Sequence, residues 1–224
     1  MKTPILVFDM DGVLVDVTES YREAIAQTVE HFTGNRIANE RIQDYKNNGG
    51  WNDDWQLSHH IVTGAGVSVS FEEVKRYFQS IFTGPSGLIM REKWVARPGM
   101  LEKLNQHFSF ALFTGRPRPE AEFTLNRFAP ELMFDPIVGM HEVKNHKPAP
   151  DGLLQIRETQ GEGKMFYIGD TVDDARSAKA AAVPFIGIAA PENPRYLDLV
   201  FLFQAEGAYA IVDDINYLEE VLTS

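Results

Sequence analysis

The sequence has no cysteine, no long hydrophobic run and no excess of positive charge. Without cysteine, disulfide bonds, thiol nucleophiles and cysteine-ligated zinc or iron–sulfur sites are excluded. The first apolar run, Ile5–Phe8, is too short for a signal peptide, and no later run reaches membrane-spanning length. We therefore expect a soluble, cytoplasmic protein.

Acidic residues outnumber basic ones, with 32 Asp and Glu against 21 Lys and Arg and a formal net charge of -11 over 224 residues. This balance argues against nucleic acid or an anionic membrane surface as a partner. It does not exclude an anionic substrate, because the local field at a site decides that. Hydrophobic residues make up 44% of the chain, which is enough for a sizeable core.

Short apolar runs alternate with helical patterns through most of the chain. The runs at Ile5–Phe8 and 165–168 are continuously apolar, which is typical of parallel strands covered on both faces. The other predicted strands are residues 108–113, 136–140, 184–189 and, more weakly, 209–213. The predicted helices between and after them are residues 100–107, 119–128, 151–158, 173–182 and 195–204. This alternation predicts an α/β fold, a Rossmann-like doubly wound parallel sheet.

A helical insertion interrupts this pattern after the first strand. Residues 19–34 predict an amphipathic helix with a capping box, Ser20 and Glu23, and a glycine stop at Gly34. Further helical patterns follow and no strand is obvious before "RPGM" at 97–100, where the α/β rhythm restarts. We expect a core of residues 1–16 and 97–224 and an inserted α-helical domain of residues 17–96.

Polar residues follow four of the predicted strands. The groups in chain order are Asp9 and Asp11, then "TGR" at 114–116, then Lys144 and Lys147, then Asp170, Asp173 and Asp174. Ligands of open α/β sheets bind outside the carboxyl ends of the strands, so these residues are expected to form one site.

The combination of charges at this edge indicates phosphoryl chemistry. Clustered carboxylates raise one another's pKa, and a hard divalent cation such as Mg²⁺ removes that conflict. A lysine, a hydroxyl and exposed loop amides suit phosphoryl oxygens. A metal, an anion cradle and a free carboxylate together suggest phosphoryl transfer through an aspartate nucleophile.

Four segments then resemble, in order, the motifs of the haloacid dehalogenase superfamily: "FDMDGVLVD", "LFTGR", "KPAPDG" and "YIGDTVDDARSAKAAAV". The helical insertion resembles the cap domain of its phosphoglycolate-phosphatase-like branch. The resemblance covers essentially the whole chain and is specific in the core, but only topological in the cap. It implies a Mg²⁺-dependent phosphatase that hydrolyses a small phosphate monoester, a sugar phosphate or a phosphoglycolate-like acid, through an aspartyl-phosphate.

The resemblance also implies catalytic roles. Asp9 matches the nucleophile, and Asp11 matches the general acid that later serves as base for the hydrolytic water. Thr114 and the Gly115 amide match the phosphate-binding motif. Lys147 matches the lysine that neutralises the charge of nucleophile and phosphoryl group, and its position in "KPAPDG" favours it over Lys144.

The same resemblance implies a metal site. Its ligands would be the Asp9 carboxylate, the Asp11 backbone carbonyl and Asp170. Asp174 would hold a metal-bound water or bind the ion directly. Asp173 stands where the family often has asparagine, and an ordinary acidic residue at a helix N-terminus is an equal interpretation.

Substrate contacts are harder to assign. The stretch "YKNNGGWNDDW" at 45–55 is interpreted as a specificity loop between helices, with a rigid turn anchored by its tryptophans as the alternative. For Arg116 a solvated loop arginine is favoured over a substrate contact. The candidates for substrate specificity are Arg22, Lys46, Asn47, Asn48, Trp51 and Arg116.

Two other functions remain open beside the phosphatase. A phosphomutase of the same superfamily would return the phosphoryl group to a substrate instead of to water. A non-catalytic phospho-acceptor or binding module would share an aspartate, a metal site and a lysine, but it would need neither Asp11 nor the helical insertion. A dehalogenase is disfavoured, because its reaction needs no second aspartate and no metal. The expected partner is a small phosphorylated metabolite, bound by a monomer or a weak homodimer.

Overall fold

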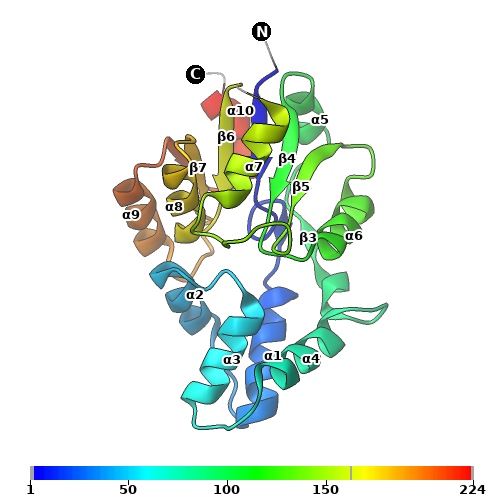
Figure 1. Cartoon of the computed structure of the whole chain (residues 1–224), viewed down its shortest axis with the longest axis vertical. Helices are drawn as coiled ribbons and strands as arrows, with labels where there is room; N and C mark the ends of the chain where they lie inside the picture. Colours follow the sequence, from blue (N-terminus) through cyan, green and yellow to red (C-terminus); the bar gives the residue numbers. More distant parts are fainter. Residues whose placement is uncertain (1–2, 162, 223–224) are drawn as a thin grey trace. The chain divides into compact units, whose positions relative to one another are not determined.

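A computed structural model describes residues 3–161 and 163–222. Its main feature is a six-stranded sheet in which every neighbouring pair is parallel, in the order β5-β4-β1-β6-β7-β8 (Figure 1). The strands are β1 (Ile5–Phe8), β4 (Ser109–Phe113), β5 (Phe134–Val138), β6 (Met165–Gly169), β7 (Phe185–Ile188) and β8 (Ala210–Val212). The predicted α/β class and parallel sheet are confirmed.

The strand order places β1 near the centre of the sheet and creates one topological switch point. From β1 the chain builds outward through β4 to β5, returns to β6 on the other side of β1, and builds outward again to β8. Connections leave β1 and β6 in opposite directions, so the carboxyl ends of these two neighbours form the switch point where ligands bind in such sheets.

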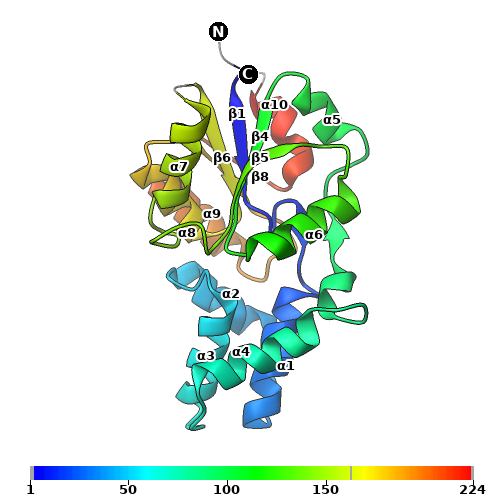
Figure 2. The same cartoon turned by 45° about the vertical axis from the view of Figure 1, so that its right-hand side comes forward.

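Helices cover both faces of the sheet, as Figure 2 shows with the sheet nearly edge-on. On one face lie α7 (Asp151–Gln160), α8 (Val172–Ala180) and α9 (Tyr196–Glu206); on the other lie α5 (Met100–Asn105), α6 (Arg118–Phe128) and α10 (Leu218–Leu222). All four residues of β1 are buried. Burial on both faces explains why β1 and β6 carry continuous apolar sequences.

One strand lies two residues nearer the N-terminus than the sequence pattern placed it. β5 runs from Phe134 to Val138, whereas residues 136–140 were expected. Pro136 lies inside the strand, which is tolerated because β5 is at the sheet edge. The Phe134 ring packs edge-on against Phe8, which draws the start of the strand into the core.

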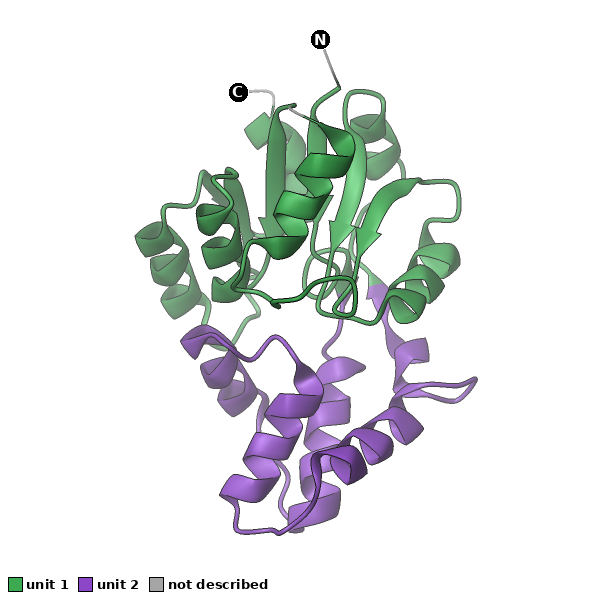
Figure 3. Ribbon diagram, in the orientation of Figure 1, with its two compact units in different colours: residues 1–15, 94–224 green, residues 16–93 purple. Residues whose placement is uncertain are grey.

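Contacts divide the chain into two compact units, residues 1–15 with 94–224 and residues 16–93 (Figure 3). The chain passes between them through two short paired strands, β2 (Val15–Asp16) and β3 (Lys93–Trp94), where no strand was expected. The second unit consists of α1 (Tyr21–Thr33), α2 (Asn39–Asn48), α3 (Asp54–Gly64), α4 (Phe71–Phe82) and a 3-10 helix at Leu88–Arg91. Among the described residues, no helix is long and apolar enough to cross a bilayer.

The predicted capping box of α1 is wrong. Ser20 is buried and its backbone, with φ -115° and ψ -93°, lies outside the extended region that an N-cap needs, so its side chain makes no cap bond. A capping box forms instead at α4, where the Ser70 side chain accepts from the Glu73 amide. The predicted glycine stop is confirmed, since Gly34 ends α1 in the left-handed conformation.

Candidate active site

A buried lysine joins two aspartates at the carboxyl edge of the sheet. Lys147 Nζ lies 2.9 Å from Asp9 Oδ1 and 2.7 Å from Asp174 Oδ1, and all three side chains are almost completely buried. Lys144, the alternative, is exposed. The Ser177 hydroxyl donates to the Ala149 carbonyl at 2.8 Å, which ties the segment after the lysine to α8. The lysine is therefore held between the ends of β1 and β6.

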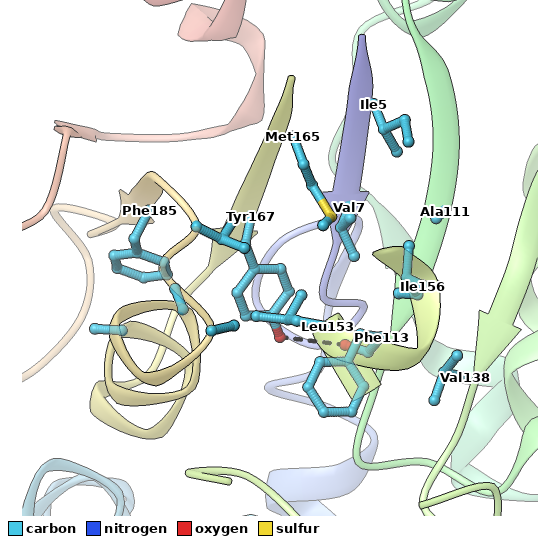
Figure 4. Close-up of a cluster of buried hydrophobic side chains, with 14 of the residues drawn as sticks. Ile5, Val7, Ala111, Phe113, Val138, Leu153, Ile156, Met165, Tyr167 and Phe185 are labelled. Atoms are coloured by element: carbon cyan, nitrogen blue, oxygen red, sulfur yellow. Dashed lines mark hydrogen bonds between the residues drawn. The ribbon is translucent and has the colours of Figure 1, made fainter. Parts of the chain in front are cut away.

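Tyr167, within β6, adds a further hydrogen bond to this cluster. Its hydroxyl lies 2.6 Å from Asp174 Oδ1 and also within hydrogen-bond distance of the Phe113 carbonyl, the bond drawn in Figure 4. The Thr171 amide and hydroxyl both donate to Asp174 Oδ2. Both Asp174 oxygens thus have protein partners. Tyr167 was not a predicted site residue, because in sequence it is one more large residue in an apolar strand.

A glycine allows Asp170 to approach Asp9 and Asp174. Gly12 has φ +71°, and a β-carbon at this position would lie 2.0 Å from Asp170 Oδ2. Only glycine combines this backbone angle with that space. As a result, carboxylate oxygens of Asp9, Asp170 and Asp174 lie within 4.8 Å of one another.

This donor set fits a hard divalent cation. All three groups are carboxylates, and oxygen ligands are what Mg²⁺ and Ca²⁺ prefer. With Asp11 included, four carboxylates face two cationic side chains, Lys147 and Arg116, so two negative charges remain if every carboxyl is ionised. A divalent cation would balance that charge.

The pKa shifts reflect the same imbalance. Burial, with the neighbouring charges of Asp174 and Asp11, raises the pKa of Asp9 to about 7 despite the attraction of Lys147. Burial alone would also raise the pKa of Asp174, but Lys147 and the hydrogen bonds from Thr171 and Tyr167 outweigh it and lower that pKa. Burial alone would lower the pKa of Lys147, and the two carboxylates outweigh it and raise that pKa.

Asp11 is held by an arginine for which a solvated position was favoured. The Nε of Arg116 donates to Asp11 Oδ1 at 2.8 Å, and its Nη2 donates to the same oxygen. The Arg116 side chain is 1% exposed, whereas that of Asp11 is 29% exposed. The solvated-loop interpretation of Arg116 is therefore wrong. The arginine turns inward because its guanidinium finds a carboxylate there.

The predicted phosphate-binding residues follow β4. Thr114 is buried, its amide donates to the Val138 carbonyl, and its Oγ1 accepts from the Arg116 amide at 3.3 Å. Gly115 is the next residue and is partly exposed. Asp173 is buried in the first turn of α8 beside Asp174.

The remaining candidates belong to the second unit. Lys46, Asn47 and Asn48 end helix α2, so the expected loop at 45–55 is reduced to the few residues between α2 and α3. Lys46 Nζ lies 2.6 Å from Asp54 Oδ1 and donates to the Trp51 carbonyl. The Trp51 ring packs against Tyr45 and His60, so its contacts are those of a structural anchor.

Arg22 and Asn47 are linked through a buried glutamine. Arg22 Nη2 donates to Gln43 Oε1, and Gln43 Nε2 donates to Asn47 Oδ1, both at 2.8 Å. An arginine only donates, so it fixes which end of the Gln43 amide faces it, and Gln43 in turn fixes Asn47. At the two ends of this series of hydrogen bonds lie the Arg22 guanidinium and the Asn47 amide nitrogen, and both are hydrogen-bond donors.

Fold and site together define a doubly wound α/β protein with an acidic, lysine-containing site at its topological switch point. The sequence pattern of the haloacid dehalogenase-like hydrolases matches residues 6–188, and the chain belongs to this family. The resemblance inferred from the four motifs is confirmed.

Individual relatives support this assignment. The chain is 32% identical to an imidazoleglycerol-phosphate dehydratase of Phytophthora nicotianae over 86% of its own length, but it spans only 45% of that protein. It is 24% identical to the phosphoglycolate phosphatase of Escherichia coli (strain K12), covering 94% of this chain and 90% of that one. A haloacid dehalogenase-like protein of unknown function from Agrobacterium tumefaciens str. C58 has the same fold, with a TM-score of 0.74 at 18% identity over 98% of this chain and 97% of that one.

Proposed function

We propose that the protein is a Mg²⁺-dependent phosphatase that hydrolyses a small phosphate monoester through an aspartyl-phosphate. The observation that carries the proposal is the buried Asp9–Lys147–Asp174 cluster, with Asp170 beside it, at the switch point of the sheet. It provides a nucleophile, a positive charge for a phosphoryl group and oxygen ligands for a cation within one small volume.

The reaction has two steps. A carboxylate oxygen of Asp9 attacks phosphorus while the bond from phosphorus to the leaving oxygen breaks, and Asp11 gives that oxygen a proton. Water then attacks the phosphorus of the aspartyl-phosphate, Asp11 takes a proton from the water, and the Asp9 carboxylate and inorganic phosphate are released. One carboxyl serves both steps because each step restores the protonation state that the other requires.

The cation would be held by the Asp9 carboxylate, the Asp11 backbone carbonyl and Asp170. It supplies charge that offsets the phosphoryl oxygens and the aspartates. Asp174 already has partners on both oxygens, so its part is to orient Lys147 and to hold a water of the cation. Asp173 adds negative charge at the start of α8.

The phosphoryl oxygens are bound by Thr114, the Gly115 amide and Lys147. Lys147 offsets their negative charge while it remains paired with Asp9. Thr114 follows β4, the neighbour of β1, so a phosphoryl group at Asp9 would lie near its hydroxyl.

The substrate carries an acceptor or anionic group in addition to its phosphate. Arg22 and Asn47 offer only donors, and donors suit a carboxylate or a second phosphate. Two relatives carry names that include phosphorylated acids or alcohols: phosphoglycolate and imidazoleglycerol phosphate. Both compounds are therefore the first substrates to test.

A screen of phosphate monoesters with and without Mg²⁺ tests this function. Inorganic phosphate would be released from at least one ester, only with Mg²⁺, and not by the Asp9→Asn variant. Asp198→Asn is the matched control, because Asp198 is an exposed aspartate on α9, and it would keep full activity. A mutase would instead convert one phosphate ester into another without releasing phosphate. Turnover of no ester at all would favour the phospho-acceptor.

A further inference from the structure

Arg116 has the largest fully buried side chain among the described residues. Its Nε and Nη2 donate to Asp11 Oδ1, and its Nη1 donates to Thr124 Oγ1 on α6 at 3.0 Å. Removing a guanidinium from water is costly unless its N–H groups are paired. An apolar residue would fill the same space without that cost, so the placement of Arg116 beside Asp11 calls for a reason other than packing.

The geometry of the pair fixes one oxygen of a carboxyl group that is itself partly exposed. A guanidinium is planar, keeps its charge and holds its donors in a rigid fork. Two of those donors meet at Asp11 Oδ1, so the rotation of the carboxyl group is constrained and Oδ2 is the oxygen that does not accept from these two donors. Because Arg116 is buried and Asp11 is partly exposed, a substrate can reach the carboxyl group but not the arginine.

We infer that Arg116 is a positioning residue that aims Asp11 Oδ2 at the leaving oxygen of the substrate. This inference rests on the proposed phosphatase function. The proton moves from Oδ2 to the leaving oxygen as the Asp9–phosphorus bond forms and the old phosphorus–oxygen bond breaks. In the second step Oδ2 takes a proton from the attacking water. Thr124 fixes the far side of the guanidinium, so α6 contributes to the alignment.

Positioning and mere structural support predict different results with different leaving groups. p-Nitrophenolate leaves without needing a proton, whereas an alkoxide needs one. In the first step, which kcat/KM reports, a misaligned proton donor therefore slows alkyl phosphates selectively, whereas a general loss of folded enzyme slows both substrates equally. The ratio of the two rates in one enzyme preparation does not depend on how much of it is folded.

The experiment measures kcat and KM for p-nitrophenyl phosphate and for the best alkyl phosphate of the panel. Arg116→Met is expected to lower kcat/KM for the alkyl phosphate about 10- to 100-fold, which is at or below the lower end of the 10²–10⁴ range of general acid catalysis because Asp11 itself is still present. It should change kcat/KM for p-nitrophenyl phosphate less than about threefold, because kcat/KM covers only the steps up to release of the leaving group and not the hydrolysis step in which Asp11 is the base. Arg116→Lys should recover part of the loss, and Thr124→Val should give a smaller loss with the same selectivity. Arg118→Met, which alters an exposed arginine nearby, is the control.

A double variant completes the test. When Asp11→Asn is already present, adding Arg116→Met should cost little more on the alkyl phosphate, because both changes remove the same proton transfer. Equal loss on both substrates, or full additivity with Asp11→Asn, would overturn the positioning role while leaving the phosphatase function intact. If the unaltered enzyme hydrolysed neither ester, the proposed function itself would fail and the inference with it.

Discussion

The aspartate proposed as nucleophile should destabilise the protein that carries it. Asp9 is buried, and its pKa rises from 3.8 to about 7 in the folded chain without a metal ion. A carboxyl group whose pKa is raised by folding lowers the free energy of unfolding of the protein as the pH rises from the unfolded pKa to the folded pKa. Above the folded pKa this loss stays constant. An asparagine in place of Asp9 would have the same shape without this penalty, and Lys147 would keep Asp174 as its partner.

The size of the effect follows from the shift. About 3 pKa units at 1.36 kcal/mol each correspond to at most about 4 kcal/mol. Asp9→Asn should therefore raise the free energy of unfolding by about 4 kcal/mol at pH 8, by about 2 kcal/mol at pH 5, and hardly at all below pH 4. The variant should at the same time be inactive.

Urea unfolding in EDTA across this pH range measures the difference. Asp198→Asn serves as the control and should show no comparable pH dependence. Excess Mg²⁺ should stabilise the unaltered protein more than the variant. At a Mg²⁺ concentration 100 times the Kd of the unaltered protein, its free energy of unfolding should rise by about 2.7 kcal/mol. An Asp9→Asn variant that is no more stable at pH 8, or a gain that does not change with pH, would refute the reasoning.

Further predictions concern the groups around this aspartate. Tyr167→Phe removes one hydrogen bond to Asp174 and should cost about 1–3 kcal/mol of stability by urea unfolding, since a buried carboxylate oxygen loses a partner; an unchanged midpoint would contradict this. Gly12→Ala should abolish Mg²⁺ binding measured by calorimetry, because the added carbon would collide with Asp170, whereas Gly34→Ala, with open space around it, should bind normally. Asn47→Ala and Arg22→Met should each raise KM about tenfold or more for a carboxylate-bearing ester and leave KM for p-nitrophenyl phosphate unchanged; equal effects on both esters would remove these residues from the substrate site.

The sheet could be predicted from the sequence because its central strands are too apolar to lie anywhere but in the interior. β1 and β6 are apolar at nearly every position, and only a central parallel strand covered on both faces accommodates that pattern. The carboxylates that follow these two strands, with Gly12 after the first, then predict where the site lies. The predicted strand at 136–140 begins at the proline, whereas β5 begins two residues earlier, because an edge strand tolerates proline within it.

Other features depend on tertiary contacts that no local pattern records. Ser20 and Ser70 both stand three residues before a glutamate, yet only Ser70 forms a capping box, because Ser20 is buried and its backbone is not extended. Arg116 follows a glycine in a polar turn, and nothing in that turn indicates that Asp11, far away in the sequence, is its partner. The bond from Tyr167 to Asp174 is hidden in the same way by the apolar strand around it.

Chemical trapping of the aspartyl-phosphate tests the central claim most directly. Borohydride reduces an acyl phosphate to an alcohol, so enzyme quenched during turnover of the best substrate should carry homoserine in place of Asp9. Mass spectrometry of the peptide that contains residues 5–16 would detect it. The account predicts reduction at Asp9 that requires both substrate and Mg²⁺ and is lost in Asp9→Asn. Phosphate release without any reducible acyl phosphate, or reduction at Asp11, Asp170 or Asp174 instead, would contradict it.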